Sequence, residues 1–187
     1  MQKTLLLILL FISQGVFADE YQEFNQQSKM AIKEFSTSLK GSLVAAMQSG
    51  GPVEAITVCN QIAPTIASEL SKKYGFEVAR TSLKVRNPNN SPDAWETDVL
   101  NQFELRKDQG EKVNTLVFSE IITTDNSQEM RLMKAIPTGQ VCLSCHGSNI
   151  PESVQTSLKE LYPNDQATGF ALGDIRGAFT IRKVSEQ

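Results

Sequence analysis

The sequence predicts an α+β fold in which an antiparallel sheet packs against helices. Apolar residues recur with helical spacing through the first part of the chain, and short segments rich in β-branched residues follow. Two or three helices followed by strands with interspersed helices is the element order of an α+β fold. A length of 187 residues, with 40% hydrophobic and 21% charged residues, is typical of one soluble globular domain.

Residues 1–18 are typical of a secretory signal peptide that is cleaved after Ala18. A basic start at Lys3 precedes a mostly apolar run, and Val16 and Ala18 stand where signal peptidase accepts small residues. An uncleaved membrane anchor is the alternative, but the run is short for a span, which needs about 20 residues. We therefore expect export to the periplasm, with residues 19–187 forming a single domain without stable membrane insertion.

Two helices are expected next, and the first of them is long. From Asp19 to Gln48, apolar residues recur mostly every three or four positions. Ser49-Gly50-Gly51 ends this helix, and Pro52 suits the first turn of the second helix, which ends near Gly75. Pro64 lies within the second helix and has no amide hydrogen to donate, so we expect a kink or a restart there.

A strand and a third helix follow. Phe76 to Val85 alternates and carries β-branched residues, which predicts a strand. The run from Asn87 to Pro92 is dense in turn formers and predicts a loop. The third helix is expected to open at Pro92-Asp93 and to close near Gly110.

The rest of the chain completes the expected sheet. In chain order, we expect a strand from Val113 to Ile122, the polar turn Asp125-Asn126-Ser127, a strand from Glu129 to Ile136, an irregular segment from Pro137 to Ile150, a short helix from Pro151 to Leu161, and a last strand from Gly177 to Val184.

Composition limits the function classes. The net charge is −3 and the pI about 5.3, which gives no electrostatic support for nucleic-acid binding. The chain has one histidine and three cysteines. A single histidine excludes sites that need two, such as a His-Glu-x-x-His zinc protease or a bis-histidine haem.

Cys142-Leu143-Ser144-Cys145-His146 is the Cys-x-x-Cys-His signature of c-type haem attachment. Two thiols add across the two vinyl groups of one haem, and the histidine after the second cysteine reaches the iron from the same side. The motif predicts one covalently attached haem c, with Cys142 and Cys145 forming thioethers and His146 as an axial iron ligand. The export signal and the position of the only histidine agree with this interpretation.

Other interpretations of the cluster remain open. A Cys-x-x-Cys-His run can occur by chance or serve a structural role, and a Cys-x-x-Cys run can form a dithiol redox pair. Such pairs, however, sit where a strand opens into a helix, whereas this motif lies in a segment that is expected to be irregular. Cys59, Cys142, Cys145 and His146 also add up to a Cys₃His set, which can bind structural zinc tetrahedrally.

Cys59 is the odd cysteine, and it lies on the apolar stripe of the second helix. A buried, unreactive thiol is the usual account of such a position. The functional account is a second axial ligand, whose thiolate would favour ferric iron and lower the reduction potential. A methionine ligand would do the reverse, and the candidates are Met30, Met47, Met130 and Met133.

Five stretches give the chain a resemblance to a known family. They are Ala55 to Pro64, Arg80 to Asn90, Pro92 to Glu96, Cys142 to Gly147, and Tyr162 to Phe179. The runs Arg-x-Ser-x-Lys-x-Arg-Asn-Pro and Gly-Asp-Ile-Arg-Gly within them are the most distinctive. On these residues the chain resembles the single-haem, c-type PAS-like domain family, whose members occur as exported stand-alone proteins and as sensory modules of bacterial signalling proteins.

The resemblance implies a PAS-like core, with the haem in a pocket between an antiparallel sheet and its flanking helices. It also implies His146 as one axial ligand and Cys59 as the other. The partners of the haem propionates stay open. Arg80, Lys84, Arg86 and Arg176 are candidates because they fall in the distinctive stretches, although solvated surface charge is the default for each.

Two function classes compete. The first is a sensing or binding module that reports redox state or a diatomic gas, such as NO or CO, to a periplasmic partner protein. The second is a one-electron carrier. An enzyme such as a peroxidase is not expected. It needs an open iron face with acid–base groups beside it, and the chain has no second histidine to act there.

Overall fold

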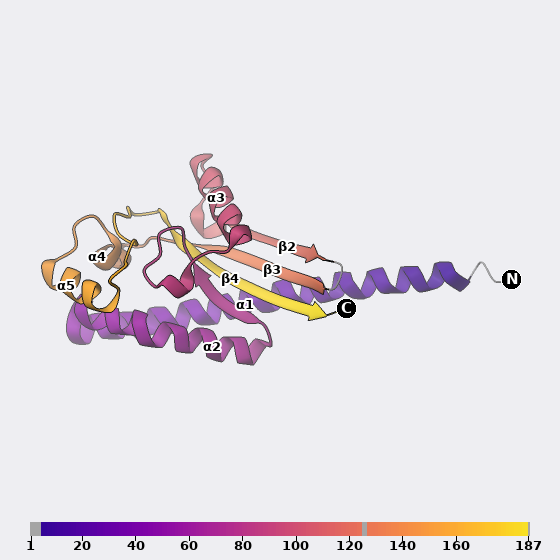
Figure 1. Ribbon diagram of the computed structural model, residues 1–187, viewed down its shortest axis with the longest axis horizontal. Helices are drawn as coiled ribbons and strands as arrows, with labels where there is room; N and C mark the ends of the chain where they lie inside the picture. Colours follow the sequence, from indigo (N-terminus) through magenta and orange to yellow (C-terminus); the bar gives the residue numbers. More distant parts are fainter. Residues whose placement is uncertain (1–4, 125–126, 187) are drawn as a thin grey trace.

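The structure is a computed structural model that describes the backbone of residues 5–124 and 127–186 and the side chains of residues 19–124 and 127–185. Within these residues lies a four-stranded antiparallel sheet in the order β1-β4-β3-β2. Its strands are β1 (Glu77–Thr81), β2 (Val117–Thr123), β3 (Ser127–Pro137) and β4 (Ile175–Glu186). The predicted α+β class, with an antiparallel sheet and a long N-terminal helix, is confirmed and is consistent with a PAS-like fold (Figure 1).

The long helix α1 (Leu5–Thr57) contains the expected break. Gly51 has φ 73° and ψ −162°, so two helical segments meet there, and Pro52 begins the second. A π-helical turn (Val58–Ile62) joins α1 to α2 (Ala63–Tyr74), and Gly75 ends α2 with a φ of 72°. Residues 1–4 of the predicted signal peptide lie outside the described residues, and cleavage after Ala18 stays a prediction.

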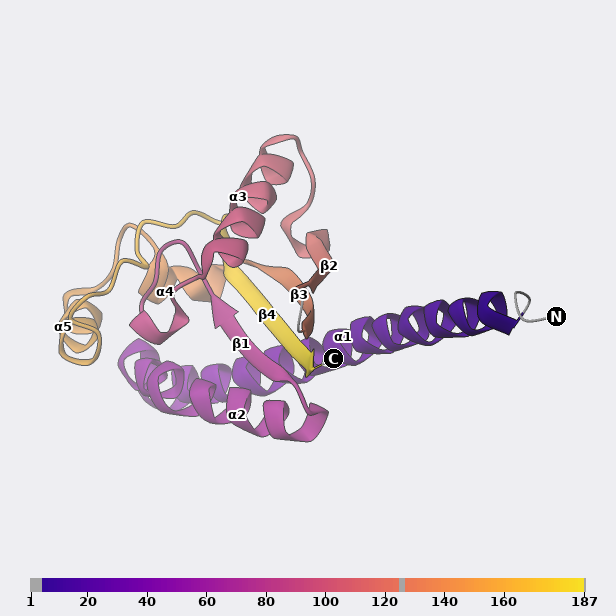
Figure 2. The same ribbon diagram turned by 45° about the vertical axis from the view of Figure 1, so that its right-hand side comes forward.

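Helices cover both faces of the sheet. α1 and α2 lie against one face, and α3 (Ala94–Asp108) lies against the other (Figure 2). Neighbouring residues of a strand point to opposite faces, so on β3 Leu132 packs with α1 and α2 while Met133 packs with α3. Each face therefore has its own apolar core.

The α1–α2 core contains large apolar side chains from both helices and three strands. They are Phe24, Ile32, Phe35, Ile66, Leu70, Val78, Leu132, Phe179 and Ile181. The α3 core is smaller and contains Val99, Leu100, Phe103, Leu116, Met133, Ala135 and Ala178.

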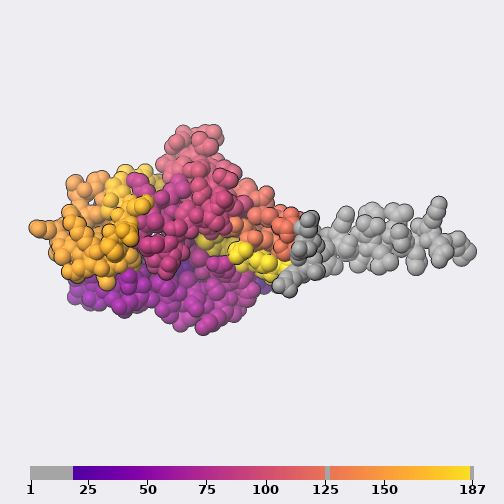
Figure 3. Space-filling model, viewed as in Figure 1, coloured from indigo at the N-terminus to yellow at the C-terminus, as the bar shows by residue number. Residues whose placement is uncertain are grey.

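The motif segment and its neighbours occupy one end of the sheet. α4 (Leu143–His146) and α5 (Glu152–Leu161) lie at the end opposite the chain's N-terminus, above the last turns of α1 (Figure 1). The space-filling view shows the α5 region resting on α1 (Figure 3), and Ile56 of α1 packs there with Val154, Leu158 and Tyr162. This end of the fold encloses the site described below.

Some element bounds differ from the expected ones. β1 ends at Thr81 rather than Val85, because the Ser82 hydroxyl donates to the carbonyl of Arg176 at 2.9 Å and the chain turns away from β4. A 3-10 turn (Val113–Thr115) precedes β2, where the strand was expected to begin. Two residues of the predicted polar turn, 125 and 126, lie outside the described residues.

The remaining predicted helices are confirmed with small shifts. Asp93 caps α3 by accepting from the amide of Glu96, which in turn accepts from the amide of Asp93. The segment expected to be irregular contains two short helical turns, Gln140–Cys142 and α4. In the described part of the chain, no helix has the length and apolar character required to span a bilayer.

Candidate functional site

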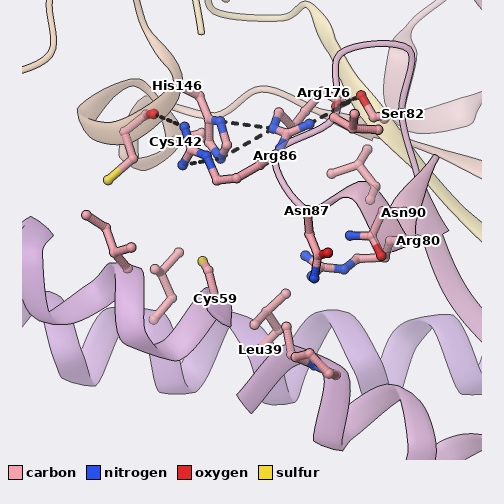
Figure 4. Close-up of a pocket in the computed structure, with 18 of the residues that line it drawn as sticks. Leu39, Cys59, Arg80, Ser82, Arg86, Asn87, Asn90, Cys142, His146 and Arg176 are labelled. Carbon is pink, nitrogen blue, oxygen red and sulfur yellow. Dashed lines mark hydrogen bonds between the residues drawn. The ribbon is translucent and has the colours of Figure 1, made fainter. Parts of the chain in front are cut away.

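A cavity of about 380 Å³ lies between α1 and α2, strand β1 and the segment that carries the Cys-x-x-Cys-His motif. All four predicted site residues line it: Cys59, Cys142, Cys145 and His146. Cys59 rises from the helical wall, while Cys142 and His146 lie on the opposite wall (Figure 4). The fold thus brings together the motif and a cysteine that lies far from it in the sequence.

Apolar side chains make up much of the cavity wall. They are Phe35, Leu39, Leu43, Met47, Ala55, Ile56, Ala63, Pro64, Ala67, Ile136 and Val141. A cavity of this kind, with a few polar groups at set positions, is typical of a small-molecule or cofactor site.

Cys59 reaches the cavity because it lies in the π-helical turn (Val58–Ile62). The amide of Ala63 donates to the carbonyl of Val58, five residues back, instead of bonding four residues back. Pro64 explains the wider turn, because it has no amide hydrogen and its ring crowds the carbonyl four residues before it. The predicted kink at Pro64 is confirmed in this form, and single π-turns are often found at functional sites.

The cysteines are free thiols in the structure. Burial raises the pKa of Cys59, although the nearby arginines Arg80, Arg86 and Arg176 act in the opposite direction. Burial also raises the pKa of Cys145. Both side chains are therefore neutral thiols at neutral pH.

The motif itself forms one and a half helical turns. Gln140–Cys142 runs directly into α4, so Cys142 and Cys145 lie three positions apart on neighbouring turns. The amide of Gly139 contacts the Sγ atom of Cys142 at 3.4 Å. This geometry directs both thiols and the following His146 to the same cavity.

His146 is fixed by its backbone partner. Its Nδ1 atom lies 2.7 Å from the carbonyl oxygen of Ala167, which can only accept, so we assign the proton to Nδ1. Nε2 is then the acceptor, and it lies 3.4 Å from Nη1 of Arg86. Nε of Arg176 lies near both ring nitrogens, 3.2 Å from Nδ1 and 3.3 Å from Nε2. Burial, together with the charges of Arg176 and Arg86, holds the pKa of His146 well below its usual value, so the ring is neutral.

Arg86 ties the motif to the loop that positions His146. Its guanidinium donates to the carbonyl oxygens of Cys145 at 2.5 Å and Ala167 at 3.2 Å. It also pairs with the carboxylate of Asp165 at 3.0 Å, and both side chains are at least nine-tenths buried. Asp165 in turn accepts from the amide of Ala167 at 2.8 Å, which closes the network around the carbonyl that holds His146.

Three of the four predicted propionate candidates line the cavity. Arg80, Arg86 and Arg176 do so, which makes the default of solvated surface charge wrong for them. Burial, reinforced by Arg86 and Arg80, lowers the pKa of Arg176 to about 10, which leaves it charged at neutral pH. Lys84 is exposed and its ammonium group lies 5.2 Å from the ring of Phe170, outside the cavity.

The methionine candidates divide between cavity, surface and core. Met47 lines the cavity, Met30 is 51% exposed, and Met130 and Met133 are buried in the two sheet cores. Trp95 packs against Phe118 away from the cavity. Met47 is therefore the one methionine of these four that shares a wall with Cys59.

The donor set does not assemble as a zinc site. Within the described residues, no three side chains among His, Cys, Asp and Glu lie close enough together to hold a metal ion. Cys59 lies on the helical wall of the cavity, whereas Cys142 and His146 lie on the opposite wall (Figure 4). The arrangement does not support the Cys₃His alternative.

Several site residues escaped the sequence analysis. Asp165 and Ala167 hold His146, and Tyr162, Asn87 and Asn90 line or border the cavity. The only signal was that all five lie in stretches that carry the family resemblance, Arg80 to Asn90 and Tyr162 to Phe179. Asn87 does build the expected turn, since its side chain accepts from the amide of Asn89 at 3.0 Å.

Comparisons with known proteins agree with this fold. No curated protein matches the chain. The crystal structure of the cyanobacterial heme-protein Tll0287 superimposes with a TM-score of 0.67 at 25% identity, covering 88% of this chain and 98% of that one. The model of the Tll0287-like family matches residues 14–183, which shows that the chain belongs to the Tll0287-like family.

Proposed function

We propose that this chain is an exported haem protein whose cavity holds one covalently attached haem c between His146 and Cys59. The observation that carries the proposal is that the complete Cys-x-x-Cys-His motif and Cys59 line one largely apolar cavity from opposite walls. A structurally similar member of the family is a heme-protein, which supports the same cofactor here.

The residues present fit such a group. Cys142 lies on the same wall as His146, and Cys145 precedes His146 in α4 and lines the same cavity, as thioether attachment and axial ligation from one side require. The Nδ1 proton is held by the carbonyl of Ala167, so the lone pair that a metal needs is on Nε2. A bound haem would supply one-electron redox chemistry and an iron that can take a diatomic gas.

Two changes in the chain must accompany binding. Arg86 lies beside Nε2 and Arg176 lies beside both ring nitrogens, and their long contacts with Nε2 must be released when that nitrogen becomes a metal ligand. Cys59 must lose its proton. Burial raises its pKa and opposes this loss, while the nearby positive charge of the arginines favours it. The arginines therefore offset part of the cost of burying an anionic sulfur ligand.

Among functions of such a protein, we propose sensing of redox state or of a diatomic gas through a partner protein. Cys59 lies on a π-turn that is continuous with α1 and α2, and these helices form one whole face of the sheet core. Detachment of Cys59 from a bound iron would let this turn change its hydrogen-bonding pattern. A turn with two hydrogen-bonding arrangements would supply the two-state element that a sensor needs.

We also propose that the chain is not an enzyme. In the part of the chain that the structure describes, the cavity lining has no carboxylate, and its one imidazole is assigned to the metal. General acid–base catalysis at the iron would need such groups beside the open face.

Absorption spectroscopy of the Cys59→Ala variant tests the ligand assignment. We expect a changed ferric spectrum and a higher reduction potential, because a thiolate ligand favours ferric iron. Met47→Leu is the matched control, since it alters the same wall without removing the thiol, and its spectrum should be that of the wild type. An unchanged spectrum in Cys59→Ala would assign Cys59 to the core packing instead.

Gas titration separates sensing from electron transfer. A sensor should bind CO or NO with displacement of one ligand and a conformational change in α1 and α2, measurable by hydrogen exchange. Inertness to both gases, together with rapid electron exchange with redox proteins, would favour the electron carrier.

A further inference from the structure

We propose that the Arg80 end of the cavity is a carboxylate-binding site that receives the propionate groups of the haem, with Arg80 as the main donor and Asn87 beside it. This inference rests on the haem proposed above and assigns the position of its polar edge.

Arg80 breaks the pattern of its strand. On β1, residues 78 and 80 share a face, and Val78 on that face is buried in the α1–α2 core. Arg80 points to the same side, where its guanidinium lies 5.3 Å from the ring centre of Phe35. A guanidinium on the core-facing side of a strand costs free energy unless a partner compensates it, and such local conflicts are expected at functional sites.

No partner of this kind is found in the protein. Within the described residues, no hydrogen bond or ion pair engages the side chain of Arg80, although Arg86 and Arg182 each have a carboxylate partner. The Asn87 amide uses its oxygen to accept from Asn89, which leaves its NH₂ group directed to the cavity region near Arg80 (Figure 4). An anion at this end would find donors from two side chains.

The charge of the cavity requires an anion. Three arginines line it, the lining itself contains no aspartate or glutamate among the described residues, and Asp165 forms its ion pair with Arg86. The charges of Arg80 and Arg176 are left without a carboxylate partner in the described chain. Two propionates carry two negative charges, so a haem would balance them.

The position of Arg80 agrees with the chemistry of haem. The vinyl groups that form thioethers and the propionates lie on opposite edges of the porphyrin ring. Cys142 lies at one end of the cavity in Figure 4, Arg80 with Asn87 and Asn90 lies at the other, and Cys59 lies between them. A ring attached at Cys142 and Cys145 and ligated by Cys59 would therefore direct its propionates to Arg80.

The test compares two probes, ferric protoporphyrin IX and its dimethyl ester, which lacks the two negative charges. Their affinities for the full chain produced without covalent haem are measured by absorption titration. In the wild type, we expect the ester to bind about ten- to a hundredfold more weakly, as loss of charged hydrogen bonds predicts. In Arg80→Gln this difference should disappear, and in Arg80→Lys, which keeps the charge, part of it should remain.

Lys84→Gln is the matched control, because it removes the same charge from a nearby side chain outside the cavity. Circular dichroism checks that each variant is folded. In addition, resonance Raman spectra of the haem-loaded protein should show shifted propionate bands in Arg80→Gln and unshifted bands in Lys84→Gln.

The outcomes are distinct. If the wild type does not distinguish the two probes, or if Arg80→Gln still does, the carboxylate site at Arg80 is wrong while the haem proposal stands. If Arg176→Gln alone removes the difference, the propionates lie at Arg176 and this inference is overturned. If the wild type binds neither probe and carries no haem after expression with haem-attachment machinery, the proposed function fails and this inference fails with it.

Discussion

Replacing Asp165 by asparagine tests the network that positions His146. Asp165 is 10% exposed and pairs with Arg86, which is 7% exposed, and its carboxylate also accepts from the amide of Ala167. Asparagine keeps the size of the side chain and one oxygen acceptor but removes the charge. The variant therefore leaves the Arg86 guanidinium buried without a counter-ion.

The magnitude follows from burial. Breaking a buried ion pair by removing one partner typically costs about 3–5 kcal/mol, because the remaining charge has lost its compensation. For a domain of this size, each kcal/mol lowers Tm by about 2–4 °C, so the expected fall is roughly 6–20 °C. The carbonyl of Ala167 would also move, which would loosen the hold on His146 Nδ1.

The assay is thermal unfolding followed by circular dichroism, with an exposed ion pair as the control. Arg106 and Glu111 form a closer pair, with N···O at 2.6 Å against 3.0 Å for Arg86 and Asp165, but their side chains are 34% and 37% exposed. Exposed pairs contribute about 0–1 kcal/mol, so Glu111→Gln should lower Tm by no more than a few degrees. The two substitutions differ mainly in the burial of the pair.

A double substitution completes the test. Arg86→Met combined with Asp165→Asn removes the uncompensated charge and should recover part of the loss in Tm, because both charges are gone. Equal, small shifts for Asp165→Asn and Glu111→Gln would refute the reasoning. The reasoning would also be refuted if the losses in Tm of the two single variants, Arg86→Met and Asp165→Asn, added up in the double variant. Additive losses would mean that the two residues act independently.

Three further predictions concern the scaffold of the site. Gly177→Ala should destabilise the protein by about 1–3 kcal/mol, because a Cβ there would collide with the carbonyl oxygen of Thr81. Gly41→Ala, on open helix surface, is the control and should be neutral or stabilising by up to about 1 kcal/mol. Chemical denaturation measures the free energy of unfolding of both variants. Although burial acts to raise the pKa of Asp93, hydrogen bonding and a neighbouring arginine hold this pKa below 3.8. The contribution of Asp93 to stability is therefore present above pH 4 and is lost as the pH falls through the lower folded pKa. Asp93→Asn should flatten acid unfolding in that range, and an unchanged acid transition would contradict this prediction. Pro64→Ala restores an amide donor and should convert the π-turn towards an α-helix. The absorption spectrum of the haem-loaded protein should therefore shift, whereas an identical spectrum would mean that the proline does not determine the turn.

Local patterns were sufficient for most of the elements. The break at Gly51 and the end of α2 at Gly75 follow from glycine, and the capping of α3 follows from Asp93 and its partner three residues on. The ends of the strands were harder to predict from the sequence. β1 ends early because the hydroxyl of Ser82 donates a hydrogen bond to the carbonyl oxygen of Arg176, which is distant in the sequence.

The site was predictable where its chemistry is local in sequence. The Cys-x-x-Cys-His motif is read from five consecutive residues, whereas the inclusion of Cys59 depended on resemblance, and the structure brings both to one cavity. The arginines were assigned by default to the surface, because the sequence of β1 does not reveal that Arg80 faces α1 and α2. Likewise, the bond between Ala167 and His146 uses a backbone carbonyl, which no residue type can signal.

The central claim is that the cavity holds a covalently attached haem. Intact-mass spectrometry under denaturing conditions, on full chain expressed with haem-attachment machinery, tests it most directly. We expect a chain heavier by one haem, with no added mass when Cys142 and Cys145 are both replaced by alanine. A wild-type chain that is colourless and has the unmodified mass would contradict the account.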